Sequence, residues 1–292
     1  MDHGAAHEGS EKRRATLYVV ATPIGNLGDI SQRALETLKS VDVVAAEDTR
    51  VTGRLLAHYG ITRRLIPVHE HNERHALRQV LDLLSSGLSV ALTSDAGTPT
   101  LSDPGALVVA AAREAGHAVV PVPGANAAVA ALSAAGITSQ HHLFYGFLPE
   151  RAAARRRALA ELAPLPYSLV FYEAPHRVEE CIEDLRTVLG GVRRIVLARE
   201  LTKLFETVHA GTLAEAGGWL AADPARRKGE FVLIVEGAGE AQAADAATAR
   251  RVLEALLAEL PPRKAAAVTA KITGGNSKAL YKVALQLKSR DK

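Results

Sequence analysis

The stretch that decides the fold class covers residues 16–46 and reads TLYVVATPIGNLGDISQRALETLKSVDVVAA. It opens with an apolar run (16–21), continues through a glycine-containing loop (22–29) and a helical pattern (31–40), and ends in a second apolar run (41–46). Short apolar runs that alternate with helical patterns are typical of buried strands in a mostly parallel sheet with helices on both faces. The stretch therefore predicts an α/β fold.

The alternation extends along most of the chain and pauses only near residues 136–142, so we expect a domain boundary near residue 138. This gives an N-terminal αβα domain (16–138) and a C-terminal αβα domain (139–238). The further expected strands are 89–93, 118–122, 143–147, 169–172, 194–198, 207–211 and 231–235. The further expected helices are 52–59, 72–86, 106–115, 125–135, 152–162, 178–189 and 213–222.

Both ends of the chain differ from this pattern. Residues 1–15 are polar and lack the apolar stretch of a signal peptide, so we expect a disordered leader. An alanine-rich linker (237–247) precedes three helical patterns at 248–260, 263–273 and 277–288, with Thr248 as the expected N-cap of the first. We expect residues 248–292 to form a small helical module of helix-turn-helix type.

The charge is unevenly distributed between the body and this module. Residues 250–292 carry ten Lys/Arg and three Asp/Glu, a net charge of +7. Residues 15–249 carry 22 basic and 26 acidic residues, a net charge of −4. A basic module on an acidic body indicates a polyanionic partner, although a solvated helical face remains the alternative.

Several classes of protein are excluded or disfavoured. A single cysteine, Cys181, rules out an internal disulfide and fits a reducing cytoplasm; it lies in a helical pattern, where we expect it to be packed. No apolar run approaches the ~20 residues that span a bilayer. His69, His71 and His75 have no further ligand cluster beside them, so we expect no metal site. The P-loop and the Gly-x-Ser-x-Gly motif are both absent.

Three loops that follow expected strands combine turn-forming and polar residues: 22–29, 94–105 and 121–126. Open α/β sheets bind ligands at the carboxyl ends of their strands. Gly25 and Gly28 do not have dinucleotide-binding spacing, but Asp95 and Thr98 can hydrogen-bond a polar ligand. The alternative is a plain turn for the first loop and an ordinary surface loop for the second.

Charged residues also follow strands at 47–50, 171–177 and 198–203. The first group can cap a helix through Asp48 or Thr49, or face a cleft. The other two combine a carboxylate with a cation, as structural salt bridges do and as a cleft that holds phosphate and ribose does. The residues alone leave both interpretations open.

Six motifs occur together in one order: TPIGNLGDISQRALETL with VDVVAAEDTR, SDAGTPTLSDPG with VPVPGANA, FYGFLP, FYEAPHR, ARELTK, and GEFVLIVEG. Over residues 16–288 the chain resembles the ribosomal RNA small-subunit methyltransferase I family, a branch of the tetrapyrrole methylase superfamily. The resemblance implies 2′-O-methylation of a cytidine in the decoding region of 16S rRNA, with S-adenosylmethionine as the cofactor. It also implies two αβα domains with the cofactor in the cleft between them, and a homodimer. The chain departs from the family pattern at Ala174, where serine is expected.

The matching motifs carry site residues over to this chain. The expected cofactor-binding residues are Pro23, Gly25, Asn26, Asp95, Gly97, Thr98, Pro99, Leu101, Asn126, Ala127, Tyr172 and Phe231. The cations expected to contact RNA phosphates are Arg50, Arg177, Arg199 and Lys203.

A ribose hydroxyl ionises far above neutral pH, so a base must accept its proton during or after methyl transfer. The candidates are Glu47, Asp48, Glu173, His176 and Glu200, and the sequence does not choose among them.

Three other functions remain open at this stage. A tetrapyrrole-precursor methyltransferase shares the superfamily but needs no basic helical module. A diphthine synthase acts on a protein side chain, and the motifs at 22–27 and 171–173 argue against it. A non-enzymatic RNA-binding protein would explain the module but not the polar strand-end loops.

Overall fold

The computed structural model of the chain describes residues 15–69 and 71–290, together with their side chains outside 240–247 and 289–290. Two compact units make up the chain: residues up to Ala134 with Ala198–Val208 form the N-terminal unit, and Ala135–Leu197 with His209–Lys292 form the C-terminal unit. This division falls four residues before the expected boundary and assigns residues 198–208, which we expected in the second domain, to the first unit. The expected leader lies outside the described residues, apart from Ala15.

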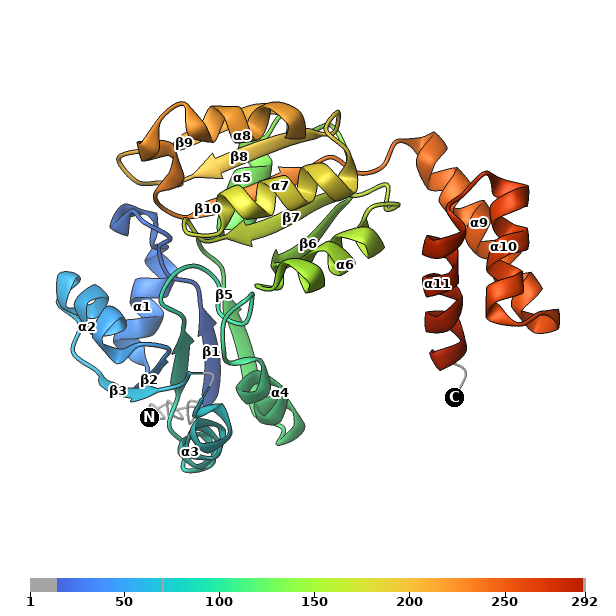
Figure 1. The fold of residues 1–292 in the computed structure, drawn as a ribbon. Coiled ribbons are helices and arrows are strands. Elements are labelled where there is room, and N and C mark those ends of the chain that lie inside the picture. Colours follow the sequence, from blue (N-terminus) through green and yellow to red (C-terminus); the bar gives the residue numbers. More distant parts are fainter. Residues whose placement is uncertain (1–14, 70, 291–292) are drawn as a thin grey trace, which may run out of the picture. The chain divides into compact units, whose positions relative to one another are not determined.

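The N-terminal unit contains a five-stranded sheet in the order β3-β2-β4-β1-β5, in which all neighbours are parallel (Figure 1). The strands are β1 (Thr16–Val20), β2 (Val43–Ala46), β3 (Arg64–Pro67), β4 (Val90–Thr93) and β5 (Ala118–Val122). The helices are η1 (Leu27–Asp29), α1 (Gln32–Ser40), α2 (Thr49–His58), α3 (Glu73–Ser85), α4 (Ala106–Glu114) and α5 (Ala127–Ala134).

Both faces of this sheet are covered by helices, which is why its inner strands β2 and β4 are buried at every position. Val43 and Ala45 of β2 pack in one core cluster with α3 and α4, whereas Val44 between them packs in another with α1 and α2. Successive side chains of a strand point to opposite faces, so a strand buried on both sides must be apolar at every position. The prediction of an α/β domain is confirmed.

The sequence prediction missed β3. This strand lies at the edge of the sheet and pairs only with β2 among the described strands. Ile66 is its only buried residue, and Arg64 and Pro67 are exposed. An edge strand needs no continuous apolar run, and proline is tolerated there because one side makes no ladder hydrogen bonds.

The C-terminal unit contains a second sheet in the order β6-β7-β10-β8-β9. Its strands are β6 (His142–Phe147), β7 (Ser168–Glu173), β8 (Arg194–Arg199), β9 (Thr207–Thr212) and β10 (Phe231–Val235). Strand β6 runs parallel to β7, but β10 runs antiparallel to it, so this sheet is mixed. The helices are α6 (Ala152–Leu162), α7 (Val178–Leu189), α8 (Leu213–Ala221) and η2 (Pro224–Arg227).

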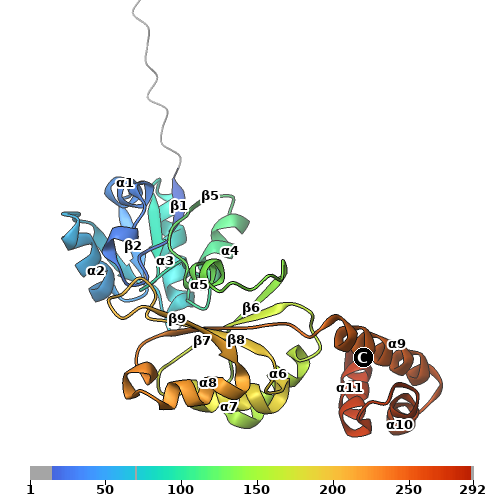
Figure 2. The same ribbon diagram turned by 90° about the horizontal axis from the view of Figure 1, so that it is seen from above.

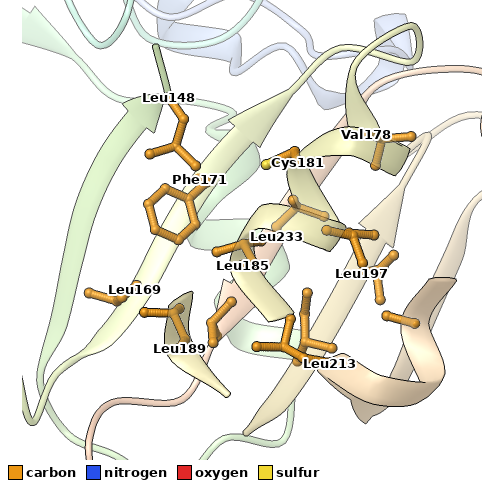
Figure 3. Packing of buried hydrophobic residues seen from close by; sticks show 14 of the residues in the cluster. Leu148, Leu169, Phe171, Val178, Cys181, Leu185, Leu189, Leu197, Leu213 and Leu233 are labelled. Atoms are coloured by element: carbon orange, nitrogen blue, oxygen red, sulfur yellow. The ribbon is translucent and has the colours of Figure 1, made fainter. Parts of the chain in front are cut away.

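One face of the second sheet packs against α6, α7 and α8 around a single core cluster (Figures 2 and 3). Phe171 and Leu169 of β7, with Leu233 of β10, meet Leu185 and Cys181 of α7 there. Cys181 is fully buried, and burial raises the pKa of its thiol above the ordinary value. The expectation that Cys181 is packed is therefore confirmed.

The chain ends in three helices, α9 (Glu240–Glu259), α10 (Pro262–Thr273) and α11 (Ser277–Arg290), which share a small core around Leu253, Ala265, Ala266 and Ala284. The predicted N-cap at Thr248 is wrong, because α9 begins eight residues before it and Gly239 is the N-cap. Alanine has the highest helix propensity, so the alanine-rich stretch taken for a linker continues the helix.

Candidate functional site

The loops after β1 and β4 are joined at the carboxyl edge of the first sheet. The N–H of Thr22 donates to the carbonyl of Gly97 at 2.8 Å, and the N–H of Gly97 donates back to the carbonyl of Thr22 at 3.1 Å. The Thr22 hydroxyl also donates to the carbonyl of Ser94 at 3.2 Å. Since β1 and β4 are neighbouring parallel strands, both predicted loops lie at one edge, where α/β sheets bind ligands.

The loop after β4 holds an unusual backbone path. Gly97 and Gly105 have φ angles of +79° and +115°, and the non-glycine residues Thr100 and Ser102 have φ angles of 73° and 69°. A Cβ on Gly105 would lie 2.8 Å from a methyl carbon of Leu92. Left-handed φ at non-glycine residues costs free energy and tends to cluster at functional sites.

Neighbouring groups brace this loop. The carboxylate of Glu73 accepts the N–H groups of Gly105 and Leu107 at 2.9 and 3.2 Å, so it caps the start of α4. The hydroxyl of Thr98 donates to the carbonyl of Ala125 at 3.2 Å, and the side chain of Asn126 accepts the N–H of Val129 at 3.0 Å. Two expected cofactor residues, Thr98 and Asn126, thus hold the loops after β4 and β5 through their side chains.

A cavity of about 340 Å³ lies in the N-terminal unit, beside the joined loops. Its walls come from the loop after β1, from α2 and from the start of the loop after β4. The apolar and glycine part of the lining is Pro23, Ile24, Gly25, Leu27, Val51, Leu55 and Ala96; the polar part is Thr22, Thr52, Arg54, Ser94 and Asp95. Small-molecule sites are typically about 300–1,000 Å³, mostly apolar, with a few polar groups.

Three of the expected cofactor residues line this cavity: Pro23, Gly25 and Asp95. The others in this unit lie outside its lining: Asn26, Gly97, Thr98, Pro99, Leu101, Asn126 and Ala127. Gly97 and Pro99 are buried, whereas Leu101 is exposed. The lining combines an apolar surface, which suits a nucleoside, with one carboxylate, Asp95, and one cation, Arg54.

Carboxylates from two neighbouring strands meet beside the cavity. Glu47 follows β2, and its side chain accepts the N–H of Asp95 at 3.2 Å. Asp95 follows β4, and its side chain accepts the N–H of Asp48 at 3.0 Å. The parallel pairing of β2 with β4 therefore brings residues 47 and 95 together across the ends of the strands.

Burial and mutual repulsion raise the pKa values of Glu47, Asp95 and Asp103, the last of which is the second carboxylate of the loop 94–105. Burial is the largest cause for Glu47 and Asp95, and neighbouring negative charges add to it. Burial, with repulsion from Glu47 and Asp95, raises the pKa of Asp103 to about 6. In contrast, hydrogen bonds from Arg50 lower the pKa of Asp48. Groups with raised pKa values in a site are candidates for proton transfer near neutral pH.

Asp103 was not among the predicted site residues. Its position as the second carboxylate of the loop 94–105 was visible in the sequence, but its proximity to Glu47 was not. The two residues are far apart in the chain, and only the adjacency of β2 and β4 brings their loops together.

The segment 200–206 lies against the loop after β1. The N–H of Asn26 donates to the hydroxyl of Thr202 at 3.1 Å, and a Cβ on Gly25 would lie 2.5 Å from Cγ of Lys203. Gly25 is thus required for the close approach of this segment. Glu200 and Thr202 have φ angles of 51° and 66°, and Lys203 bonds the carboxylate of Glu200 at 2.8 Å.

The four cations expected to contact RNA differ in exposure. Arg50 is exposed and pairs with Asp48 at 2.6 Å, and Lys203 pairs with Glu200. Arg199 is buried and donates to the carbonyl of Phe205 at 3.0 Å, and Arg177 donates to the carbonyl of Leu148 at 2.6 Å. Arg177 and Arg199 therefore use their guanidinium groups within the fold.

Glu173 and His176, two of the five candidate proton acceptors, lie in the C-terminal unit. Glu173 ends β7, is buried, and forms an ion pair with Arg177 at 3.2 Å. His176 is exposed in the turn before α7. Tyr172 contacts the rings of Phe144 and Phe147 edge to face, and Phe231 is buried in the core. The ion pair is the structural alternative for Glu173, whose catalytic role stays a prediction.

Among the residues that the structure describes, no cluster of three or more His, Cys, Asp or Glu side chains could hold a metal ion. No helix in the same part of the chain is long and apolar enough to cross a bilayer.

Comparison with known proteins gives matches along nearly the whole chain. Residues 16–217 match the family model of the tetrapyrrole (corrin/porphyrin) methylases, and residues 243–288 match the RsmI C-terminal HTH domain. The ribosomal RNA small subunit methyltransferase I of Escherichia coli O157:H7 is 51% identical over 96% of this chain and 98% of its own. The protein of the same name from Pseudomonas aeruginosa is 53% identical over 93% and 97%. The chain belongs to the ribosomal RNA small subunit methyltransferase I family.

Solved structures of tetrapyrrole methylases share the fold of this family member. The uroporphyrin-III-C-methyltransferase of Thermus thermophilus aligns with a TM-score of 0.54 at 23% identity, over 76% of this chain and 94% of its own. The cobalt precorrin-4 methyltransferase CbiF aligns with a TM-score of 0.58 at 17% identity, over 79% and 98%. The expected fold class, two α/β domains of tetrapyrrole-methylase type followed by a helical module, is confirmed.

Proposed function

We propose that this chain transfers a methyl group from S-adenosylmethionine to the ribose 2′-oxygen of a cytidine in the decoding region of 16S rRNA. The observation that carries the proposal is the identity of about half of all residues to ribosomal RNA small subunit methyltransferases I, over 91–96% of the chain. That similarity includes the basic helical module as well as both α/β domains.

A tetrapyrrole precursor is the alternative substrate, because the fold is shared with corrin and porphyrin methylases. Those solved structures are covered almost completely by this chain, yet they leave about a quarter of it without a counterpart. Residues 250–292 alone carry a net charge of +7. A cationic module of this kind favours a polyanion such as RNA over a single small molecule.

The cofactor supplies a methyl group on a sulfonium, which is already activated and leaves as a neutral thioether. The chain must therefore bind a cationic nucleoside, hold the ribose oxygen in line with the methyl group and remove one proton. We assign the first task to the cavity with Pro23, Gly25 and Asp95 in its lining. The carboxylate of Asp95 complements the positive charge, and the apolar part of the lining can pack against the nucleoside.

We assign the removal of the proton to the carboxylate cluster Glu47, Asp95 and Asp103. The 2′-oxygen forms a bond to the methyl carbon, the carbon–sulfur bond breaks, and the hydroxyl proton passes to a carboxylate. A raised pKa makes a carboxylate a better proton acceptor as long as it is ionised at the working pH. The pKa of Asp103, at about 6, meets both conditions near neutral pH.

We further propose a homodimer that works in the cytoplasm. The homodimer is an expectation from the family resemblance, and the cytoplasm is an expectation from the single cysteine, which fits a reducing compartment. Sedimentation analysis of the purified chain tests the dimer.

The function is tested with rRNA from a strain that lacks this protein. We expect one ribose methylation in the decoding region to disappear, and a plasmid copy of the gene to restore it. In parallel, purified protein is incubated with labelled S-adenosylmethionine and either small ribosomal subunits or a free tetrapyrrole precursor. Transfer to the tetrapyrrole alone would reject the rRNA proposal in favour of the alternative.

A further inference from the structure

Helix α11 has two distinct faces. Leu280, Val283, Ala284 and Leu287 pack in the small core that the helix shares with α9 and α10. Lys278, Tyr281, Lys282 and Leu285 are exposed. Their spacing is i, i+3, i+4 and i+7, so they lie on one stripe of the helix, turned away from the core.

The exposed stripe, defined here as the α11 face, combines positive charge with an aromatic ring. Tyr281 and Leu285 have 37% and 47% of their surface exposed. No Asp or Glu occurs anywhere from residue 260 to residue 290, whereas seven Lys or Arg do. The cations of this face therefore have no acidic residue of their own helix or of α10 to pair with. The carboxylate of Glu161 lies against the same helix at Gln286, whose side chain donates to it at 3.0 Å.

The turn before α11 fixes how this face is presented. Helix α10 ends at Thr273, and its C-cap Gly274 has a φ of +71°, which suits glycine. Three residues separate α10 from α11. The side chain of Asn276 accepts the N–H groups of Lys278 and Ala279 at 2.9 and 3.2 Å. The first turn of α11 is thus held in place, and in DNA-binding helix-turn-helix proteins the second helix of the pair is the one that contacts the bases.

From this geometry we propose that the α11 face is the surface by which the module binds RNA. Lys278 and Lys282 contact phosphates, and Tyr281 stacks on an unpaired base beside them. Aromatic side chains next to cations are the common means of binding single-stranded RNA, because every base has a stacking face. The proposal rests on the proposed function, since it takes rRNA as the substrate, and adds which residues hold it.

The test uses the full-length chain and a transcript of the 16S decoding region, with binding measured between about 50 and 200 mM salt. The double variant Lys278→Gln/Lys282→Gln removes two phosphate contacts. The plot of log K against log salt should therefore become shallower, with a slope smaller in magnitude by about 1.5. The matched control, Arg250→Gln/Arg251→Gln, removes the same charge from α9 and should change the slope and affinity much less.

Stacking is tested separately from charge. We expect Tyr281→Ala to weaken binding of the transcript about tenfold and Tyr281→Phe to leave it nearly unchanged, because the ring alone stacks. Tyr281 lies outside the module core, so both variants should keep the wild-type thermal midpoint. Affinity for S-adenosylmethionine should stay unchanged in every variant.

Equal losses in the α9 control and the α11 variant would overturn the proposal in favour of a bulk charge effect. Variants that bind the transcript normally but fail to methylate assembled subunits would also overturn it, because the face would then dock on a ribosomal protein. Methylation of small subunits by the wild-type chain is measured alongside. Its absence would refute the proposed function, whereas its presence with unaffected α11 variants would refute this inference alone.

Discussion

Replacement of Glu173 by glutamine is expected to destabilise the protein more than it slows methyl transfer. The carboxylate is fully buried, accepts the N–H of Ala174 at 2.9 Å, and pairs with Arg177 at 3.2 Å. Glutamine keeps an oxygen for Ala174 but loses the charge that faces the guanidinium group. Removal of one partner from a buried ion pair costs about 3–5 kcal/mol.

For Glu173→Gln we expect a loss of free energy of unfolding at the lower end of this range, about 3 kcal/mol. Arg177 retains 16% of its side-chain exposure and still donates to the carbonyl of Leu148, so its charge is not left entirely uncompensated. A loss of about 3 kcal/mol corresponds to a fall of roughly 6–12 °C in the thermal midpoint for a chain of this size.

Thermal unfolding and single-turnover methylation should be measured on the same preparation. The control is Glu179→Gln, which makes the same chemical change at an exposed residue of α7. Glu179 pairs with Arg227 at 3.4 Å. An exposed pair contributes about 0–1 kcal/mol, so this midpoint should fall by no more than about 4 °C. If Glu173→Gln keeps the wild-type midpoint and loses its rate at least about tenfold, about 1.4 kcal/mol, Glu173 acts in catalysis and the structural assignment is wrong.

Three further predictions concern the first unit. Asp103→Asn should become more stable relative to the wild type as the pH rises from about 4 to above 6, because the raised pKa of Asp103 means that its ionisation opposes folding; midpoints that differ by a constant across this range would contradict it. Gly97→Val should abolish binding of S-adenosylmethionine in calorimetry while the protein stays folded, since φ is +79° and a Cβ would lie 3.3 Å from the Ile24 side chain that lines the cavity; undiminished affinity would remove this loop from the site. Glu47→Gln should lower single-turnover methylation at least about tenfold, about 1.4 kcal/mol, with little change in cofactor affinity, and an unchanged rate would exclude Glu47 as an essential proton acceptor.

The sequence located strands of two kinds: β2 and β10 are buried at every position, whereas β5 and β9 are partly exposed. The boundaries of β2 and β10 were predicted within two residues, because full burial demands an unbroken apolar run. Strand β3 and the start of α9 were missed for two different reasons. The edge strand needs few apolar residues, and the alanine-rich start of α9 has no side-chain cap to mark it.

The location of the site at the strand ends could be predicted, but not which loops meet. Glu47 and Asp95 became neighbours only through the order β3-β2-β4-β1-β5, which depends on how strands pair across the whole domain. The contact of Gly25 with Lys203 was equally hidden. Strand order is set by packing between distant segments, so a local pattern carries no record of it.

The carboxylate cluster makes the first sheet less stable than it would be with neutral residues at its strand ends. Each raised pKa among Glu47, Asp95 and Asp103 means that the folded protein holds a negative charge at a cost in free energy. A cationic ligand in the neighbouring cavity would lower that cost by pairing with the charge, and so would a proton delivered during the reaction. The same arrangement that opposes folding therefore favours both binding of a sulfonium and acceptance of a proton. By linkage, the affinity for a cationic ligand should rise as the pH increases through about 6, where Asp103 ionises.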